Sequence, residues 1–222
     1  MADHVIRRLA EGTCLRPVSG HFGFDRGEPI DRYYIEEFLA AHAKDIQGHV
    51  LEVGSDSYTR KFGRNRVIKS DVLHVVPGNP KATVVGDLAC ADQIPANEFD
   101  CIVLTQTLQM IYDVRAAIRH IHRILKPGGV MLVTSHGISK LDLANDYRDQ
   151  WHLTSHSARK LFAEVFPGDC FEVQAHGNVL VAIASLHGLG QRELRRAELD
   201  YVDPAYEVLI TVRAMKPQDE TV

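Results

Sequence analysis

Short apolar runs alternate with amphipathic stretches along most of the chain, and this alternation predicts the fold. Five runs rich in valine, isoleucine and leucine are typical of strands that are covered on both faces, as in a parallel sheet. They span 49–53, 67–70, 82–85, 99–105 and 130–134. Between the last two, apolar positions recur at helical spacing over 113–125 and end at Lys126-Pro127-Gly128-Gly129. This order predicts a right-handed crossover between two parallel strands.

Helical and extended patterns continue on both sides of this region. Helical spacing occurs over 31–47, where Asp31 can cap the first turn, and over 155–166, 179–187 and 191–198. Two further strands are expected at 170–175 and 206–214. The sequence therefore predicts an α/β fold: a Rossmann-like, doubly wound, mostly parallel seven-stranded sheet with helices on both faces.

The length of 222 residues suits one α/β domain with additions better than two complete domains. Glycines and prolines in 1–29 predict an irregular N-terminal arm, which packs over the domain or becomes ordered on binding. The domain itself is expected over 30–217, with lid or insert segments at about 136–156 and 178–200, and a tail over 218–222.

Composition narrows the class of partner. The 25 lysines and arginines nearly balance the 29 acidic residues, for a net charge of −4, so the chain lacks the basic field that nucleic acids or acidic membranes require. The four cysteines are far apart and are expected to be unbridged. With neither a secretory signal nor a membrane span predicted, we expect a cytoplasmic protein with a small-molecule partner, and a homodimer is left open.

The strongest chemical signal follows the first predicted strand, where Glu52, Gly54 and Asp56 lie in the segment Leu51-Glu52-Val53-Gly54-Ser55-Asp56. A glycine turn at this end of a sheet brings backbone N–H groups up to a ligand. The segment lacks the G-x-G-x-x-G pattern of dinucleotide-binding folds, which disfavours a nicotinamide dehydrogenase. Its two carboxylates would repel a pyrophosphate and attract a ligand that carries an ammonium and a sulfonium.

Three further segments follow in order: Ser70-Asp71-Val72, Gly86-Asp87-Leu88 and Lys126-Pro127-Gly128-Gly129. Together with the first loop, over about 29–161, they resemble the class I S-adenosylmethionine-dependent methyltransferases, in particular the small bacterial methyltransferase type 11 group. The resemblance implies S-adenosylmethionine as the cofactor. The second glycine usual in the first loop of that family is replaced here by Asp56.

The resemblance also implies a role for each matching residue. Glu52, Gly54 and Asp56 would contact the methionine part of the cofactor, Asp71 with Val72 would bind the ribose hydroxyls, Asp87 and Leu88 would bind the adenine, and Thr105 and Gln106 would lie beside the reacting methyl group. Many relatives carry a histidine in the loop after the fourth strand, where this chain has Gln109-Met110, so that loop supplies no base.

Candidate groups for the second substrate come mostly after the fifth strand. His136 follows that strand directly, and histidine exchanges protons near neutral pH, so His136 and His152 are the candidate catalytic residues. Trp151, beside His152, and Tyr33, in the segment before the first strand, are the candidate substrate-binding residues, with core packing as the alternative for both. The His, Cys and Asp residues show no metal-ligand spacing, so the sequence predicts no metal site.

These features predict an S-adenosylmethionine-dependent methyltransferase that acts on a small molecule, with O-methylation of a sugar or specialised metabolite preferred. Methylation of a carboxyl or nitrogen of a peptide or amino-acid-like natural product is the alternative reaction, which the missing loop histidine would suit. A non-catalytic S-adenosylmethionine-binding regulatory module is the alternative from another class, because the glycine loop is reduced.

Overall fold

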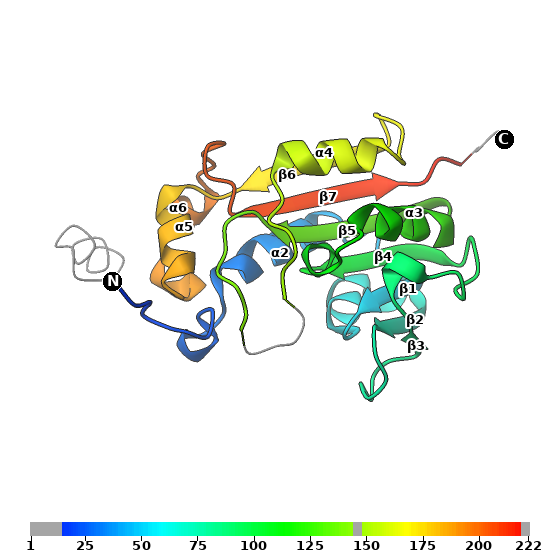
Figure 1. Ribbon diagram of the computed structural model, residues 1–222, viewed down its shortest axis with the longest axis horizontal. Helices are drawn as coiled ribbons and strands as arrows, with labels where there is room; N and C mark the ends of the chain where they lie inside the picture. The colour runs from blue at the N-terminus through cyan, green and yellow to red at the C-terminus, as the bar shows by residue number, and fades with distance from the viewer. Residues whose placement is uncertain (1–14, 144–147, 219–222) are drawn as a thin grey trace.

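A computed structural model describes residues 15–143 and 148–218. The seven strands form one sheet in the order β3-β2-β1-β4-β5-β7-β6, with β7 antiparallel to both of its neighbours and the other pairs parallel. Their bounds are β1 (Gly48–Val53), β2 (Val67–His74), β3 (Val84–Val85), β4 (Phe99–Thr105), β5 (Leu125–His136), β6 (Phe171–His176) and β7 (Leu209–Met215). This architecture confirms the predicted fold class (Figure 1).

Helices cover both faces of the sheet. Their bounds are α2 (Ile30–Ala41), α3 (Val114–Ile124), α4 (Ser155–Ala163), α5 (Val179–Leu186) and α6 (Arg196–Asp200). Shorter helical turns are η1 (Phe24–Arg26), η2 (Thr59–Gly63), η3 (Arg64–Arg66), η4 (Leu88–Cys90), η5 (Leu108–Met110) and η6 (Gln191–Glu193).

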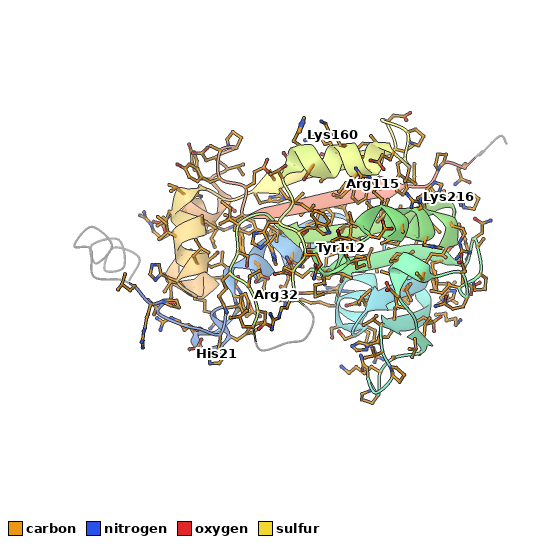
Figure 2. The ribbon with its side chains drawn as sticks, viewed as in Figure 1. His21, Arg32, Tyr112, Arg115, Lys160 and Lys216 are labelled. Carbon is orange, nitrogen blue, oxygen red and sulfur yellow. The ribbon has the colours of Figure 1, made fainter. Side chains whose placement is uncertain are left out.

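Each face of the sheet has its own apolar core. On one face α3 and α4 pack against strand residues such as Leu51 and Leu104, and on the other α2, α5 and α6 pack against residues such as Val50 and Val103. Neighbouring strand residues therefore enter different cores, as the alternation of side chains along a strand requires. Arg115 of α3, labelled in Figure 2, forms an ion pair with Glu164 just after α4 (2.9 Å), and this pair links α3 to α4.

Helix α3 shows why the predicted pattern works. Its buried residues follow the helical repeat: Val114, Ala117, Ile118, Ile121 and Ile124. Asp113 begins the helix, because its carboxylate accepts a hydrogen bond from the backbone N–H of Ala116 (2.9 Å). The following Lys126-Pro127-Gly128-Gly129 segment lies within β5, whose first residue, Leu125, pairs with Phe99.

Several predicted boundaries are wrong. The expected cap Asp31 is the second residue of α2, which begins after Pro29, and the helix expected over 191–198 is divided into η6 and α6. Strand β2 does not end at Ser70 but continues to His74. The polar residues of β2 remain in the sheet because the Asp71 carboxylate contacts His49 Nε2 (2.6 Å) and Lys69 Nζ (3.0 Å).

The strand order creates a crevice at the carboxyl ends of β1 and β4. The chain runs from β1 outward through β2 and β3, then returns to place β4 on the other side of β1. Loops that leave neighbouring strands in opposite directions leave space between them, and open α/β sheets bind their ligands at such a point.

Parts of three predictions lie outside the described residues: 1–14 of the arm, 144–147 of the first lid segment, and the tail beyond 218. The described part of the arm lies against the domain, where Ser19 N donates to His187 O (3.0 Å) and Pro29 pairs with Gly190. Among described residues, Cys90, Cys101 and Cys170 are unbridged, as predicted. No helix in the described part of the chain is long and apolar enough to cross a bilayer.

Candidate active site

Two cavities of about 540 Å³ each adjoin at the carboxyl ends of the strands. The first, the Asp87 cavity, is lined by Val53, Gly54, Leu73, His74, Val75, Gly86, Asp87, Leu88, Ala89, Thr105, Gln106, Thr107, Met110, Ile111, Tyr112 and Asp113. The second, the His136 cavity, includes Phe22, Phe24, Asp31, Arg32, Gln109, His136, Ile138, Asp142 and Asp149. His74, Gln106 and Met110 line both, so a molecule in one cavity can contact a molecule in the other.

The loop after β1 opens toward the Asp87 cavity at Gly54. This glycine has a φ of 79°, a left-handed conformation that other residues rarely adopt, and no atom lies within 4 Å of the position of a Cβ. A side chain at this position would be strained and would project into the open space. Gly54 thus lines the Asp87 cavity.

Glu52 holds that loop in place through hydrogen bonds to its backbone. Its carboxylate is buried and accepts hydrogen bonds from the backbone N–H groups of Thr59 (2.7 Å) and Tyr58 (3.1 Å). Burial raises the pKa of Glu52 above its ordinary value, and these two N–H groups oppose that rise. Both carboxylate oxygens are therefore engaged in fixing the chain between β1 and η2, and Glu52 does not line the Asp87 cavity.

Three other predicted residues also lie elsewhere. Asp56 and Val72 line a separate cavity of about 440 Å³, where Asp56 pairs with Arg60. Asp71 was expected where β2 ends, but β2 continues for three more residues, and Asp71 lines none of these cavities. Its carboxylate is instead occupied by His49 and Lys69.

The residue at the end of β2 is His74, which the sequence reasoning missed. It lines both cavities, and its Nδ1 lies 2.8 Å from the carbonyl oxygen of Val76. The polar residues Lys69, Ser70 and Asp71 resemble the residues that usually follow a strand, so the prediction ended β2 too early. The pairing of β2 with β1 extends from Val67 to Leu73 and carries the strand past Asp71 to His74, but the sequence alone does not display this pairing.

The remaining predicted residues of this side line the Asp87 cavity together. Asp87 caps η4 by accepting from the backbone N–H of Ala89 (2.8 Å), and Leu88 is buried beside it. Thr105 is the last residue of β4. Gln106 follows it with a φ of 50° and lines both cavities. The Gln106 side-chain carbonyl accepts from Gln109 Nε2 (2.8 Å), so this loop is linked to the His136 cavity.

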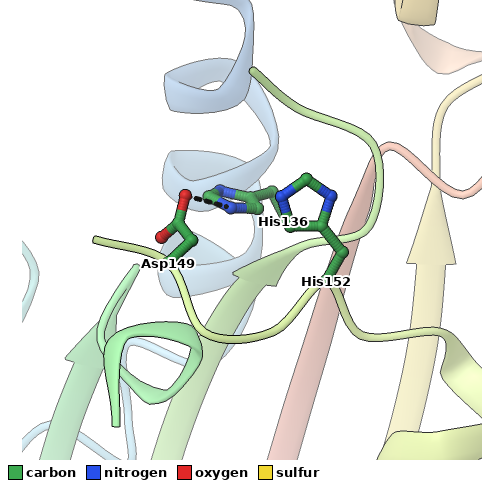
Figure 3. A group of neighbouring side chains, drawn as sticks. All are labelled: His136, Asp149 and His152. Atoms are coloured by element: carbon green, nitrogen blue, oxygen red, sulfur yellow. Dashed lines mark ion pairs between the residues drawn. The ribbon is translucent and has the colours of Figure 1, made fainter. Parts of the chain in front are cut away.

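A compact polar cluster of His136, Asp149 and His152 lies beside the His136 cavity, which His136 and Asp149 line (Figure 3). His136 Nε2 lies 3.0 Å from Asp149 Oδ2, and the rings of His136 and His152 meet edge to face with centroids 5.0 Å apart. Burial is the largest influence on His136 and lowers its pKa below the ordinary histidine value, while the Asp149 carboxylate acts in the opposite direction. The two predicted catalytic residues are thus brought together.

The two predicted substrate-binding residues are placed differently. The Trp151 indole N–H donates to the carbonyl oxygens of Ile111 (3.1 Å) and Tyr112 (3.2 Å), and its ring stacks on Tyr112, so Trp151 fastens the segment after residue 148 to the loop that follows β4. The Tyr33 hydroxyl donates to Asp200, and burial followed by this bond raises the pKa of Tyr33 to about 12. Neither side chain lines the two adjoining cavities.

The sequence reasoning also missed other residues of the His136 cavity. Phe22 and Phe24 come from the arm, and Asp149 comes from the segment that precedes Trp151. Arg32 is set on the first turn of α2, where its guanidinium lies 3.3 Å from the Tyr58 hydroxyl (Figure 2). The backbone carbonyl of Gln109 accepts from the N–H groups of Gln150 (2.7 Å) and Trp151 (3.1 Å), which holds this segment at the cavity.

Comparison with known proteins gives one family. The family described as Methyltransferase domain matches residues 10–178. Among curated proteins, the ubiquinone/menaquinone biosynthesis C-methyltransferase UbiE of Vibrio cholerae is 31% identical over 90 residues, which are 39% of this chain and 31% of that protein. The match thus spans about a third of the length of this curated relative.

Solved structures share the fold at low identity. An S-adenosylmethionine-dependent methyltransferase from Archaeoglobus fulgidus has a TM-score of 0.56 at 9% identity, over 83% of this chain and 94% of that one. Phosphoethanolamine N-methyltransferase 2 of Haemonchus contortus, in complex with phosphomonomethylethanolamine and S-adenosylhomocysteine, has a TM-score of 0.55 at 16% identity, over 84% of this chain and 53% of that one. The family match confirms that the chain is a methyltransferase domain, as the sequence predicted.

Proposed function

Because the chain belongs to the methyltransferase domain family, we propose that it methylates a hydroxyl oxygen of a small molecule, with S-adenosylmethionine in the Asp87 cavity and the acceptor in the His136 cavity. The observation that carries this proposal is the cluster of His136, Asp149 and His152, of which His136 and Asp149 line a cavity that adjoins the Asp87 cavity at Gln106. A sugar or a specialised metabolite is the preferred acceptor.

The Asp87 cavity suits the cofactor chemically. Leu88, Met110 and Ile111 give it an apolar part that suits an adenine ring, and the Asp87 carboxylate can accept hydrogen bonds from the adenine amino group. Gly54 brings backbone close to the ligand without a side chain in the way. When bound, S-adenosylmethionine supplies an electrophilic methyl group.

Two charged or polar groups complete the cofactor side of this proposal. His74, at the end of β2, occupies the place where the family carries an acidic residue, and its imidazole can form a hydrogen bond with a ribose hydroxyl. Arg32 lines the adjoining His136 cavity, where it provides a positive charge for a methionine carboxylate that reaches across from the Asp87 cavity. Asp71, held by His49 and Lys69, takes no part in this arrangement.

The His136 cavity suits a small acceptor with both apolar and polar faces. Phe22 and Phe24 offer flat apolar surfaces, while His136 and Asp149 form the polar end. His136 receives the acceptor hydroxyl there and helps to remove its proton, while the Asp149 carboxylate and the His152 ring contact His136. The walls exclude water and hold the acceptor next to the methyl donor, which contributes much of the rate of a displacement reaction.

Formation of S-adenosylhomocysteine in the presence of a panel of acceptors tests this function. The panel contains sugars and phenols with free hydroxyls, matched amines, matched carboxylates, and phenols with a free ring carbon. We expect turnover on hydroxyl acceptors. Strong turnover on amines or carboxylates with none on hydroxyls would contradict O-methylation, and tight S-adenosylmethionine binding with no product from any acceptor would instead support a regulatory module.

A further inference from the structure

The cluster of His136, Asp149 and His152 has the composition of a metal site. It supplies two imidazoles and one carboxylate, and one ligand atom from each residue can be chosen so that all three lie within 4.8 Å of one another. Two imidazoles with a carboxylate suit first-row divalent cations such as Zn²⁺, Mn²⁺ and Fe²⁺. His136 ends β5, while the other two residues come from the segment before α4, so both parts of the cluster are held by separate elements (Figure 3).

The contact between His136 and Asp149 has the spacing of two ligands of one cation. Nε2 and Oδ2 are 3.0 Å apart, and within the described residues the buried Nε2 has no well-formed hydrogen bond. Two atoms bound to the same cation at about 2.1 Å, with bond angles of about 90° to 110°, are separated by about 3.0 to 3.4 Å. The separation of the pair is therefore that of two ligands along one edge of a coordination sphere.

The surroundings favour a cation and leave room for a further ligand. His136 and Asp149 are largely buried, with 15% and 10% of their side chains exposed, whereas His152 is exposed. Asp31 and Asp142 line the same cavity and add negative charge, with Arg32 as an opposing positive group. Three protein ligands leave at least one coordination position, and the cavity lies on the side where an acceptor would enter.

We propose that His136, Asp149 and His152 bind one divalent first-row cation, and that this cation coordinates the hydroxyl of the acceptor. Coordination weakens the O–H bond. With the cation bound, His136 and His152 act as its ligands and not as bases, so the proton passes to water and the oxygen stays bound to the cation as an alkoxide. This use of the site rests on the proposed function and explains how a hydroxyl is activated where the loop after β4 offers no histidine. The sequence predicted no metal because Asp149 and His152 are three residues apart in an irregular segment, and nothing in the sequence shows that this segment returns to His136.

Metal binding by the full chain, without S-adenosylmethionine or acceptor, tests the proposal. Titrations with Zn²⁺ are followed by calorimetry and titrations with Co²⁺ by visible absorption, for the wild type and for His152→Ala and Asp149→Asn. His156→Ala is the matched control, since His156 is an exposed histidine of the nearby α4. We expect one equivalent to bind, with affinity reduced at least about tenfold in the two cluster variants and unchanged in the control.

Two results would overturn the proposal: a wild type that binds no stoichiometric Zn²⁺ or Co²⁺, or a His152→Ala variant that binds as tightly as the wild type. Because His152 is exposed, its replacement leaves the core intact, and circular dichroism checks the fold of each variant. The titrations contain neither substrate, so a negative result removes the metal site and leaves the proposed methyl transfer to be judged by the acceptor panel.

Discussion

The loops after β1 and β5 reach the same edge of the sheet, but they are built in different ways. The loop after β1 is closed by its own neighbours, with Glu52 holding the N–H groups of Tyr58 and Thr59. The end of β5 is completed by a separate segment, because the residues that meet His136 there, Asp149 and His152, come from the stretch that precedes α4. A loop closed locally positions backbone for a cofactor, whereas a site assembled from separate segments can vary with the second substrate.

His136→Ala is expected to give the largest difference in effect between the two regions: a large loss of turnover with little change in cofactor affinity. Loss of the imidazole removes a group that binds the hydroxyl, so turnover falls about 100-fold, or about 2.7 kcal/mol. The dissociation constant for S-adenosylhomocysteine stays within about twofold, since His136 does not line the Asp87 cavity. Single-turnover kinetics and calorimetry measure the two quantities, with His156→Ala as the control. A fully active variant would remove His136 from the catalytic site.

Replacement of the buried carboxylate, Glu52→Gln, tests how the loop after β1 is held. The amide has one acceptor oxygen for two N–H donors, so the free energy of unfolding falls by about 2 kcal/mol at neutral pH. Urea unfolding measures this change. An unaltered midpoint would show that the capping bonds contribute nothing to stability.

The same variant gives a pH test. Burial raises the pKa of Glu52 in the folded chain above its ordinary value, so protonation of this group favours the folded state. Its contribution to stability is fully present below the ordinary glutamate pKa and is lost as the pH rises through the raised pKa. The stability gap between wild type and Glu52→Gln should therefore widen as the pH falls from about 7 to about 4. A constant gap in urea unfolding over that range would contradict the raised pKa.

Gly54→Val tests whether the loop after β1 must stay open. The φ of 79° strains a β-branched residue, and its side chain would enter the Asp87 cavity. We expect S-adenosylhomocysteine to bind about tenfold more weakly, or about 1.4 kcal/mol, as measured by calorimetry. Gly168→Val is the control, because Gly168 is exposed, lacks a positive φ and has open space around it. Equal affinity in both variants would place the cofactor elsewhere.

The smallest effects come from the pair His74→Ala and Asp71→Asn. Loss of one hydrogen bond to the cofactor should weaken S-adenosylhomocysteine binding by about threefold to tenfold in the first variant. The second should change affinity by less than about twofold, because Asp71 lies outside the cavity. Calorimetry on both proteins makes the comparison. A loss confined to Asp71→Asn would restore the role that the sequence motif implied for Asp71.

The sheet and the loops after β1, β3 and β4 could be predicted because local patterns determine them. Apolar runs specify the buried strands, and Gly54, Asp87 and Gln106 lie where those strands end. The prediction failed for β2, where partners across the sheet satisfy polar side chains that usually end a strand. Local spacing cannot reveal such tertiary compensation.

The acceptor side was less predictable for a related reason. His136 was found because it follows a strand, but Asp149 lies in a segment with no regular pattern, and its place depends on backbone bonds from Gln150 and Trp151 to Gln109. Phe22 reaches the cavity through the packing of the arm. These positions follow from contacts between segments far apart in sequence, which a single sequence does not display.

A crystal structure of the chain with S-adenosylhomocysteine bound tests the central division into two cavities most directly. The account predicts adenosine in the Asp87 cavity, between Gly54 and Leu88, with the sulfur directed toward Gln106 and the His136 cavity left open for an acceptor. Adenosine bound beside Asp56 and Val72, or in the His136 cavity itself, would contradict it.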